Sequence, residues 1–217
     1  MKINNLFFIL LSVIIPYYFT EACDPPYTQH FFTDIYFPQY GEECFVTIVY
    51  CCWWDSQNLR LNWFVKEIRQ RSWCMVDVRD EIAWRNFKNF VYQKVARHAI
   101  LNCAPPLPSC EPPPPINVNR YFARCYKYHN FWSDKYWGSE EWLISLKSCL
   151  DRPGKCEHRL IVCVDYSLYP PDIVVLLDEC EVIQEPDCSY NVPEIPPEGK
   201  SWDEEWETEC FAKPCCP

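Results

Sequence analysis

The residues of this chain that could do chemistry are mainly its cysteines. The sequence holds 16 cysteines in 217 residues, and none of them forms a Cys-x-x-Cys pair, the spacing common in zinc and redox sites. The four histidines, His30, His98, His129 and His158, do not follow a zinc-finger spacing. An even number of cysteines at this density is typical of disulfide-bonded proteins from oxidising compartments. We therefore expect up to eight disulfides, no metal and no cofactor, and the connectivity stays open.

The sequence contains no recognisable catalytic motif. Gly-x-Ser-x-Gly, His-Glu-x-x-His and phosphate-binding glycine loops are all missing. His158 and Asp165 are seven residues apart on one expected strand, so they point to opposite faces and do not form a dyad. We predict no catalytic residue and interpret the chain as a non-enzyme. A secreted hydrolase with acids among its many Asp and Glu residues stays as an alternative.

Aromatic side chains gather in residues 129–137, which read His-Asn-Phe-Trp-Ser-Asp-Lys-Tyr-Trp. We expect a loop here that presents Trp132, Tyr136 and Trp137 beside polar neighbours. Flat rings with polar neighbours can stack on sugars or anchor protein partners. These three residues are therefore the predicted ligand-binding residues. The alternative is that the rings pack inside a domain with few other large apolar side chains.

Charge is distributed unevenly along the chain. The net charge is −10, yet residues 60–97 contain nine basic and four acidic side chains, whereas residues 121–217 contain nine basic and nineteen acidic ones. This asymmetry predicts that the acidic tail contacts the basic region 60–97, in the same molecule or in a neighbour. Two solvated faces would give the same pattern. An acidic chain is a poor partner for nucleic acid, so we expect an extracellular protein or a glycan as the partner.

The first 22 residues have the layout of a secretory signal peptide. Lys2 precedes an apolar run at residues 6–19, and Ala22 precedes the expected cleavage site. That run has 14 residues, whereas a spanning helix needs roughly 20. We expect a mature secreted or extracellular protein that begins at Cys23, without a transmembrane segment. The alternative is a periplasmic protein or one that is lipid-anchored at Cys23.

The elements expected around these residues form an α+β fold. It combines small antiparallel sheets built from hairpins with one long and one short helix, and it is disulfide-rich. The long helix is predicted at residues 78–101 with Asp77 as its N-cap, and the short helix begins at Ser139. Strands are predicted at residues 31–37, 44–52, 59–66, 118–128, 156–164 and 173–177.

The expected organisation has two halves. Prolines separate them and also mark the tail. The segments are a signal peptide at 1–22, an N-terminal hairpin-plus-helix half at 23–103, a proline-rich connector at 104–115, a C-terminal strand–helix–hairpin half at 116–180, and an acidic Cys/Pro-rich tail at 181–217.

Both expected hairpins begin with a Cys-x6-Cys strand, Cys44/Cys51 in the first and Cys156/Cys163 in the second. A separation of seven residues is odd, so the two cysteines of a strand face opposite sides of the sheet. They should therefore bond to different layers and not to each other. The repeated spacing suggests a duplicated unit, but the expected helices lie differently around the two hairpins, so a true duplication stays open.

Together these features predict a secreted, disulfide-stabilised, non-enzymatic extracellular or envelope protein that presents a binding or structural surface. A carbohydrate-binding module that uses exposed Trp and Tyr side chains is the first alternative. The secreted hydrolase is the second, and it belongs to a different functional class.

Export and complete disulfide bonding can be tested by the intact mass of the secreted protein. We expect a chain that begins at Cys23 and gains no mass on alkylation without reductant, because every thiol is oxidised. After reduction, alkylation should add 16 groups. An added lipid mass, or alkyl groups incorporated before reduction, would contradict the prediction.

Overall fold

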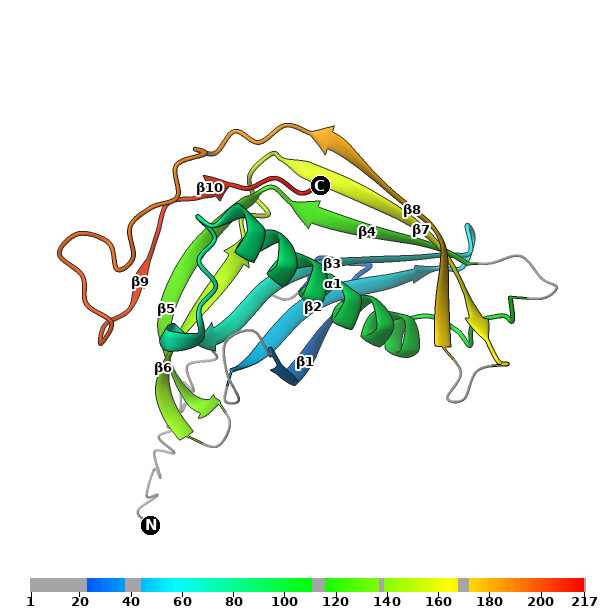
Figure 1. Ribbon diagram of the computed structural model, residues 1–217, viewed down its shortest axis with the longest axis horizontal. Helices are drawn as coiled ribbons and strands as arrows, with labels where there is room; N and C mark the ends of the chain where they lie inside the picture. Colours follow the sequence, from blue (N-terminus) through cyan, green and yellow to red (C-terminus); the bar gives the residue numbers. More distant parts are fainter. Residues whose placement is uncertain (1–22, 38–43, 111–115, 137–138, 168–171, 217) are drawn as a thin grey trace, which may run out of the picture.

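The structure is a computed structural model that describes residues 23–37, 44–110, 116–136, 139–167 and 172–216. Over these residues the chain forms one ten-stranded mixed sheet, a single α-helix, α1 (Glu81–Cys103), and a short 3₁₀ turn at Ser72–Cys74 (Figure 1). The strands are β1 (Thr28–Tyr36), β2 (Phe45–Asp55), β3 (Arg60–Arg71), β4 (Ile116–Ala123), β5 (Cys125–Tyr136), β6 (Ser139–Ser148), β7 (Lys155–Asp165), β8 (Asp172–Gln184), β9 (Trp206–Glu207) and β10 (Phe211–Ala212).

Strand β3 is the branch point of the sheet. One of its edges pairs with β2 along its length, while the other edge pairs with β4 over residues 60–64 and with β6 over residues 67–71. Lys66 is an extra residue between these two segments, because Val65 lies opposite Tyr50 and Glu67 lies opposite Val49. A bulge of this kind bends and twists its strand. The two halves of β3 therefore reach different neighbours.

Two three-stranded units meet at this branch. Strands β1, β2 and β3 form one antiparallel unit, and β4, β7 and β8 form another. Because β3 and β4 pair in parallel, each strand of the first unit has the same direction as its counterpart in the second. The disulfides Cys23–Cys51 and Cys110–Cys163 also correspond, since each joins the segment before the first strand to the middle strand. The Cys44–Cys74 disulfide has no counterpart, because Cys156 and Cys180 bond Cys215 and Cys216 instead, so a true duplication stays open.

Helix α1 begins where Asp80 caps it. The Asp80 carboxylate accepts hydrogen bonds from the backbone N–H groups of Ile82 and Ala83, which lack partners inside the helix. We predicted Asp77 as the cap, but its carboxylate accepts from the backbone N–H of Arg79 and so forms a separate turn before the helix. The helix therefore starts three residues later than the sequence suggested, at Glu81.

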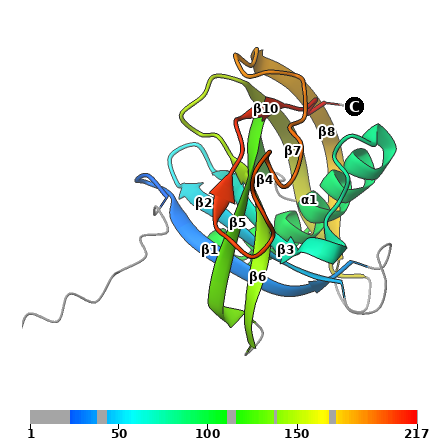
Figure 2. The same cartoon turned by 90° about the vertical axis from the view of Figure 1, so that its left-hand side faces the viewer.

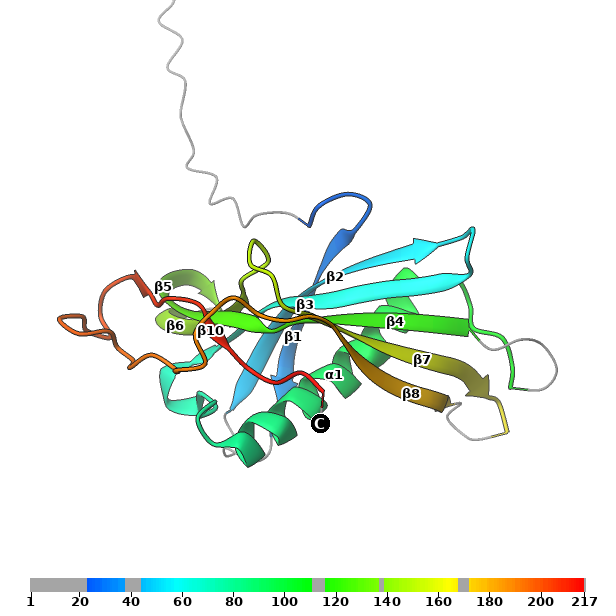
Figure 3. The ribbon, with the colours of Figure 1, turned by 90° about the horizontal axis from the view of Figure 1, so that it is seen from above.

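The hydrophobic core lies between α1 and one face of the sheet, which we call the inner face. Figures 2 and 3 show α1 against this side of the curved sheet. Phe87 and Val95 of the helix are 1 % and 0 % exposed, and they pack with Tyr50 and Trp63 of the sheet, which are both fully buried. The opposite side of the sheet is called the outer face.

Eight disulfides cross-link the fold, and the described residues include no free cysteine. Cys44 and Cys156 belong to the core, whereas Cys51 and Cys163 face the other way, and no strand bonds its own two cysteines. This confirms the prediction from their odd spacing. The pairs are Cys23–Cys51, Cys44–Cys74, Cys52–Cys103, Cys110–Cys163, Cys125–Cys188, Cys149–Cys210, Cys156–Cys215 and Cys180–Cys216.

The predicted α+β fold class is wrong. Strands make up 51% of the structure and helix 15%, and the strands join in one mixed sheet instead of small antiparallel sheets. The short helix expected from Ser139 is strand β6, which pairs with β3 on one edge and β5 on the other. Its run Leu143-Ile144-Ser145-Leu146 is buried on both faces. A short apolar run fits a buried strand as well as a helix, and these two pairing partners decide between them.

The paired segments of both predicted hairpins are confirmed, as β2–β3 and β7–β8. The strand predicted at residues 118–128 is instead the end of β4 and the start of β5. In the proline connector, the backbones of Pro108 and Cys110 hydrogen-bond Val164 of β7, while residues 111–115 lie outside the described part of the chain. Among the described residues, no helix has the length and apolar character needed to cross a membrane.

The core assignment predicts different effects for two substitutions in α1. Phe87→Ala should lower the free energy of unfolding by about 3–5 kcal/mol, because it leaves a cavity in the core. Ile82→Ala on the same helix should change it by less than about 0.5 kcal/mol, since Ile82 is 71 % exposed. Denaturant unfolding with the disulfides intact measures both, and equal losses would contradict the placement of α1.

Candidate functional site

The outer face of the sheet carries a group of polar side chains that the sequence did not reveal. Leu61 and Trp63 of β3 point into the core, so Arg60, Asn62 and Phe64 point outward. Within the described ranges the chain places neither a helix nor a second sheet on this side (Figure 3). The outer face is therefore a single-layer surface.

Four side chains of this face form a cluster across β3, β4 and β7, which we call the amide cluster: Asn62, Asn119, Tyr121 and Glu157. Asn62 lies opposite Asn119 in the parallel β3–β4 pair, and Tyr121 lies opposite Glu157 in the β4–β7 pair. Asn62, Asn119 and Glu157 are 5 %, 3 % and 9 % exposed. Neighbouring strands lie about 4.8 Å apart, so the cluster is compact.

Hydrogen bonds connect three members of the amide cluster. The side-chain Nδ2 of Asn119 donates to Glu157 Oε1 and lies 3.5 Å from the Tyr121 hydroxyl. Arg159 lies beside the cluster, 3.4 Å from the Glu157 carboxylate. Burial raises the pKa of the Tyr121 phenol, and the nearby Glu157 charge adds to the increase. Tyr121 is therefore neutral at physiological pH and keeps its O–H donor.

Aromatic side chains border the amide cluster. The Tyr27 ring meets Phe64 edge to face at 5.3 Å and Trp53 at 6.1 Å between ring centroids. The disulfide Cys23–Cys51 attaches the segment that carries Tyr27 to β2. On the other side of the cluster, the Lys155 ammonium lies 4.3 Å from the centroid of the Tyr121 ring.

A second group on the outer face consists of stacked rings around Arg69. The Arg69 guanidinium carbon lies 5.8 Å from the Phe31 ring centroid and 5.6 Å from that of Phe131, within the range of cation–π attraction. His129 stacks on Phe131 at 5.1 Å. Phe31 is 48 % exposed. We call these four residues the Arg69 stack.

The predicted aromatic site is only partly described. Residues 129–136 are not a loop but belong to strand β5, because they pair with β6. Trp132 is 50 % exposed, and its ring meets Trp142 of β6 edge to face at 5.6 Å. For Tyr136 only the backbone pairing with Ser139 is described, and Trp137 lies outside the described residues. The binding role of these three residues stays a prediction.

His158 has two partners on the inner face that the sequence did not suggest. Arg120 donates its Nη2 to His158 Nδ1 at 2.7 Å, and Asp178 lies 3.1 Å from the same nitrogen. Burial lowers the pKa of His158, and the Arg120 charge lowers it further. A ring nitrogen of His158 also lies within 4.8 Å of the two sulfurs of the Cys180–Cys216 disulfide. No nucleophile adjoins this nitrogen among the described residues, so we assign the cluster to structure.

Three groups of His and Cys side chains in the described part of the chain bring their ligand atoms within 4.8 Å of one another. Each group contains at least two cysteines, and every one of these cysteines is in a disulfide. A metal needs the thiolate form of cysteine. These groups therefore do not have the ligands of a metal centre.

The acidic tail contacts the basic region 60–97, but not in the way its charge suggested. Arg79 and Lys88 of the basic region donate hydrogen bonds to backbone carbonyls of the tail. The third contact is an ion pair, and in it the tail contributes the positive side chain, Lys213. These contacts are Arg79–Pro193 at 3.0 Å, Lys88–Cys215 at 2.6 Å and Lys213–Glu81 at 2.8 Å.

Tail carboxylates also pair with basic residues outside region 60–97. Glu207 pairs with Lys127 at 2.5 Å and with Lys147 at 3.3 Å, and Glu185 pairs with Arg124 at 2.6 Å. These contacts attach the tail to β5, β6 and the turn between β4 and β5. Docking of the tail on a neighbouring molecule stays a prediction.

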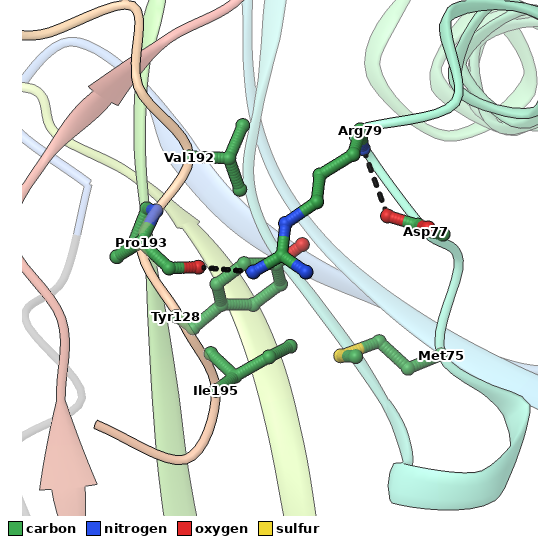
Figure 4. Close-up of a pocket in the computed structure, with 7 residues that line it drawn as sticks. All are labelled: Met75, Asp77, Arg79, Tyr128, Val192, Pro193 and Ile195. Atoms are coloured by element: carbon green, nitrogen blue, oxygen red, sulfur yellow. Dashed lines mark hydrogen bonds between the residues drawn. The ribbon is translucent and has the colours of Figure 1, made fainter. Parts of the chain in front are cut away.

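A pocket of about 240 Å³ lies where the tail meets the segment before α1 (Figure 4). The Arg79 side chain extends across it and donates to the Pro193 carbonyl. Pockets for drug-sized ligands are larger, about 300–1,000 Å³, so we interpret this one as a joint between two segments. It is lined by Met75, Asp77, Arg79, Tyr128, Val192, Pro193 and Ile195.

The histidines predict a loss of stability in mild acid. Burial is the largest cause that lowers the pKa of each of the four, His30, His98, His129 and His158. The unfolded chain therefore takes up protons near pH 6.5 that the folded chain refuses, so stability is highest above that pH and falls below it. Thermal unfolding between pH 7 and pH 5 measures the effect, and His98→Gln should reduce it. A melting temperature that stays constant or rises towards pH 5 would contradict it.

Comparison of the chain with protein-family models, with curated proteins and with solved structures finds no match. The function must therefore be argued from the side chains that the fold brings together.

Proposed function

We propose that this chain is a secreted or envelope protein that acts without catalysis, by binding a partner on the outer face of its sheet. The observation that carries the proposal is the group of polar and aromatic side chains on that face, which no described helix or sheet covers. Aromatic side chains beside a few precisely placed polar groups are common in binding sites.

Disulfides support this proposal because they hold the outer face in a fixed geometry. Cys23–Cys51 attaches one border of the face to β2, and Cys110–Cys163 attaches the other border to β7. The amide cluster lies on the strands between these two cross-links. A pre-organised surface loses less conformational entropy when it binds, which favours recognition over a purely structural role.

The Arg69 stack supports the same conclusion. Arginine and aromatic residues are enriched at the energetic centres of protein interfaces. Here the stack spans β1, β3 and β5, with exposed Phe31 at one end. A partner that covers Phe31 would also remove water from the edge of the Arg69 stack. Loss of this water strengthens the cation–π contact between Arg69 and the rings.

The hydrolase alternative is less well supported. The nearest carboxylate pair on the outer face is Glu157 and Glu181, which are opposite each other on β7 and β8. Arg159 lies 3.4 Å from each of them, so both face the same positive charge. Glycoside hydrolysis needs two carboxyl groups that flank the scissile bond of the substrate. Arg159 lies between this pair and binds both, which leaves no place for a substrate between them.

A carbohydrate-binding site at the β5–β6 hairpin is the second candidate. One observation favours it: Trp132 is half exposed and is supported from the side by Trp142. An exposed indole face of this kind can stack on a sugar ring.

The outer-face proposal can be tested with two matched variants of the mature protein. Phe31→Arg alters the outer face, and Leu101→Arg makes the same chemical change on α1, where Leu101 is 70 % exposed. Binding should be screened on a printed glycan array and on an array of purified extracellular proteins. We expect at least one specific ligand, with affinity reduced about tenfold or more by Phe31→Arg and unchanged by Leu101→Arg.

The opposite pattern, with loss only in Leu101→Arg, would contradict the proposal. So would turnover of a polysaccharide or protein substrate by the pure protein, since the proposal excludes catalysis. Melting temperatures of both variants serve as the folding control.

A further inference from the structure

The amide cluster contains a polar side chain that no other described residue binds. Asn62 is 5 % exposed, and its side chain forms no hydrogen bond with any other residue that the structure describes. Its amide atoms are not among the buried polar atoms that lack a partner, so the small exposed part of this residue includes the amide itself. Its neighbours Leu61 and Trp63 point into the core, so the Asn62 amide faces the outer surface.

The other members of the cluster extend this surface with unused hydrogen-bonding capacity. Asn119 uses its Nδ2 for Glu157 and Tyr121, so its carbonyl oxygen stays available among the described contacts. The Tyr121 hydroxyl lies 3.5 Å from Asn119 Nδ2 and beside the Glu157 carboxylate, so it can donate its proton to Glu157 or, in its place, to a ligand. Donors and acceptors are therefore interleaved within the width of three strands, which suits hydroxyl groups because each hydroxyl both donates and accepts.

The surroundings of the cluster are apolar on one side and electrically balanced overall. The Tyr27 and Phe64 rings lie at one border of the cluster, where they contact each other edge to face. Three basic and three acidic side chains lie in or beside the cluster, so the site shows no preference for a charged ligand. Lys155 contacts Tyr121, Arg159 pairs with Glu157 and Glu181, and Arg60 interacts with Asp55 and Tyr121.

We propose that the amide cluster is a binding site for a neutral glycan, in which Asn62, Asn119 and Tyr121 hydrogen-bond sugar hydroxyls and the Tyr27–Phe64 border contacts the apolar face of the ring. This inference rests on the proposed binding function and names its ligand class. The two amides lie side by side on β3 and β4, so they can reach neighbouring hydroxyls of one sugar ring. A bound sugar would take the place of solvent at the Asn62 amide, which no described side chain binds.

Asn62→Leu separates this role from a structural one. Leucine has a similar shape and no polar atoms, so replacing an unbonded amide should leave the melting temperature unchanged or raise it. The same change should weaken binding of a neutral oligosaccharide about tenfold or more, because it removes hydrogen bonds to the ligand. Tyr121→Phe should also weaken it, and Asn89→Leu on the solvent side of α1 should not.

The experiment uses the mature protein on a printed glycan array, followed by calorimetry with the soluble form of the strongest neutral oligosaccharide. Binding that is insensitive to salt, reduced in Asn62→Leu and Tyr121→Phe, and unchanged in Asn89→Leu supports the inference. Binding of sulfated glycans alone, with strong salt dependence, would overturn it. So would neutral-glycan binding that depends on Trp132→Ala and not on Asn62→Leu.

The outcomes also separate this inference from the proposed function. An extracellular protein ligand that is lost in Phe31→Arg, together with no glycan binding, overturns the glycan site but leaves the outer face as the binding surface. A ligand that is insensitive to Phe31→Arg, Asn62→Leu and Tyr121→Phe overturns both.

Discussion

The hydrogen bonding of β3 to three different strands is the constraint on which the rest of the structure depends. Its first segment joins β4 and its second joins β6, with the Lys66 bulge between them. Because a bulge bends its strand, a single sheet can continue in two directions and curve around α1. Without this branch the two antiparallel units would have no common core, and the β5–β6 hairpin would lack one of its neighbours.

The two faces of the branched sheet differ in the kind of side chain that they bury. On the inner face, α1 removes apolar side chains such as Trp63 and Val95 from water, which is the main stabilising term in folding. On the outer face, polar side chains such as Asn62 and Asn119 become nearly buried only because neighbouring side chains on a tightly cross-linked sheet crowd them.

The disulfides fix both the inner and the outer face of the sheet. The four cysteines on β2 and β7 alternate between core and outer face, and they bond to four different cysteines elsewhere in the chain. The pairs are Cys51–Cys23, Cys52–Cys103, Cys156–Cys215 and Cys163–Cys110. Cross-links restrict the unfolded chain and so favour the folded state. They also hold the border of the outer face, including Tyr27, against the sheet. The Cys23–Cys51 bond uses the sulfur that lipidation at Cys23 would require.

The sequence by itself determined the features that depend on local order and composition. Cysteine number and odd spacing predicted full pairing to different layers, and apolar spacing predicted α1 and the two pairs of hairpin strands. The tertiary structure alone decided β6, because its apolar run fits strand or helix until β3 and β5 offer it hydrogen bonds. It also decided the amide cluster, because Asn62, Asn119 and Glu157 are ordinary residues far apart in the chain. The register of the parallel β3–β4 pair brings the two asparagines together, and the register of the antiparallel β4–β7 pair adds Glu157.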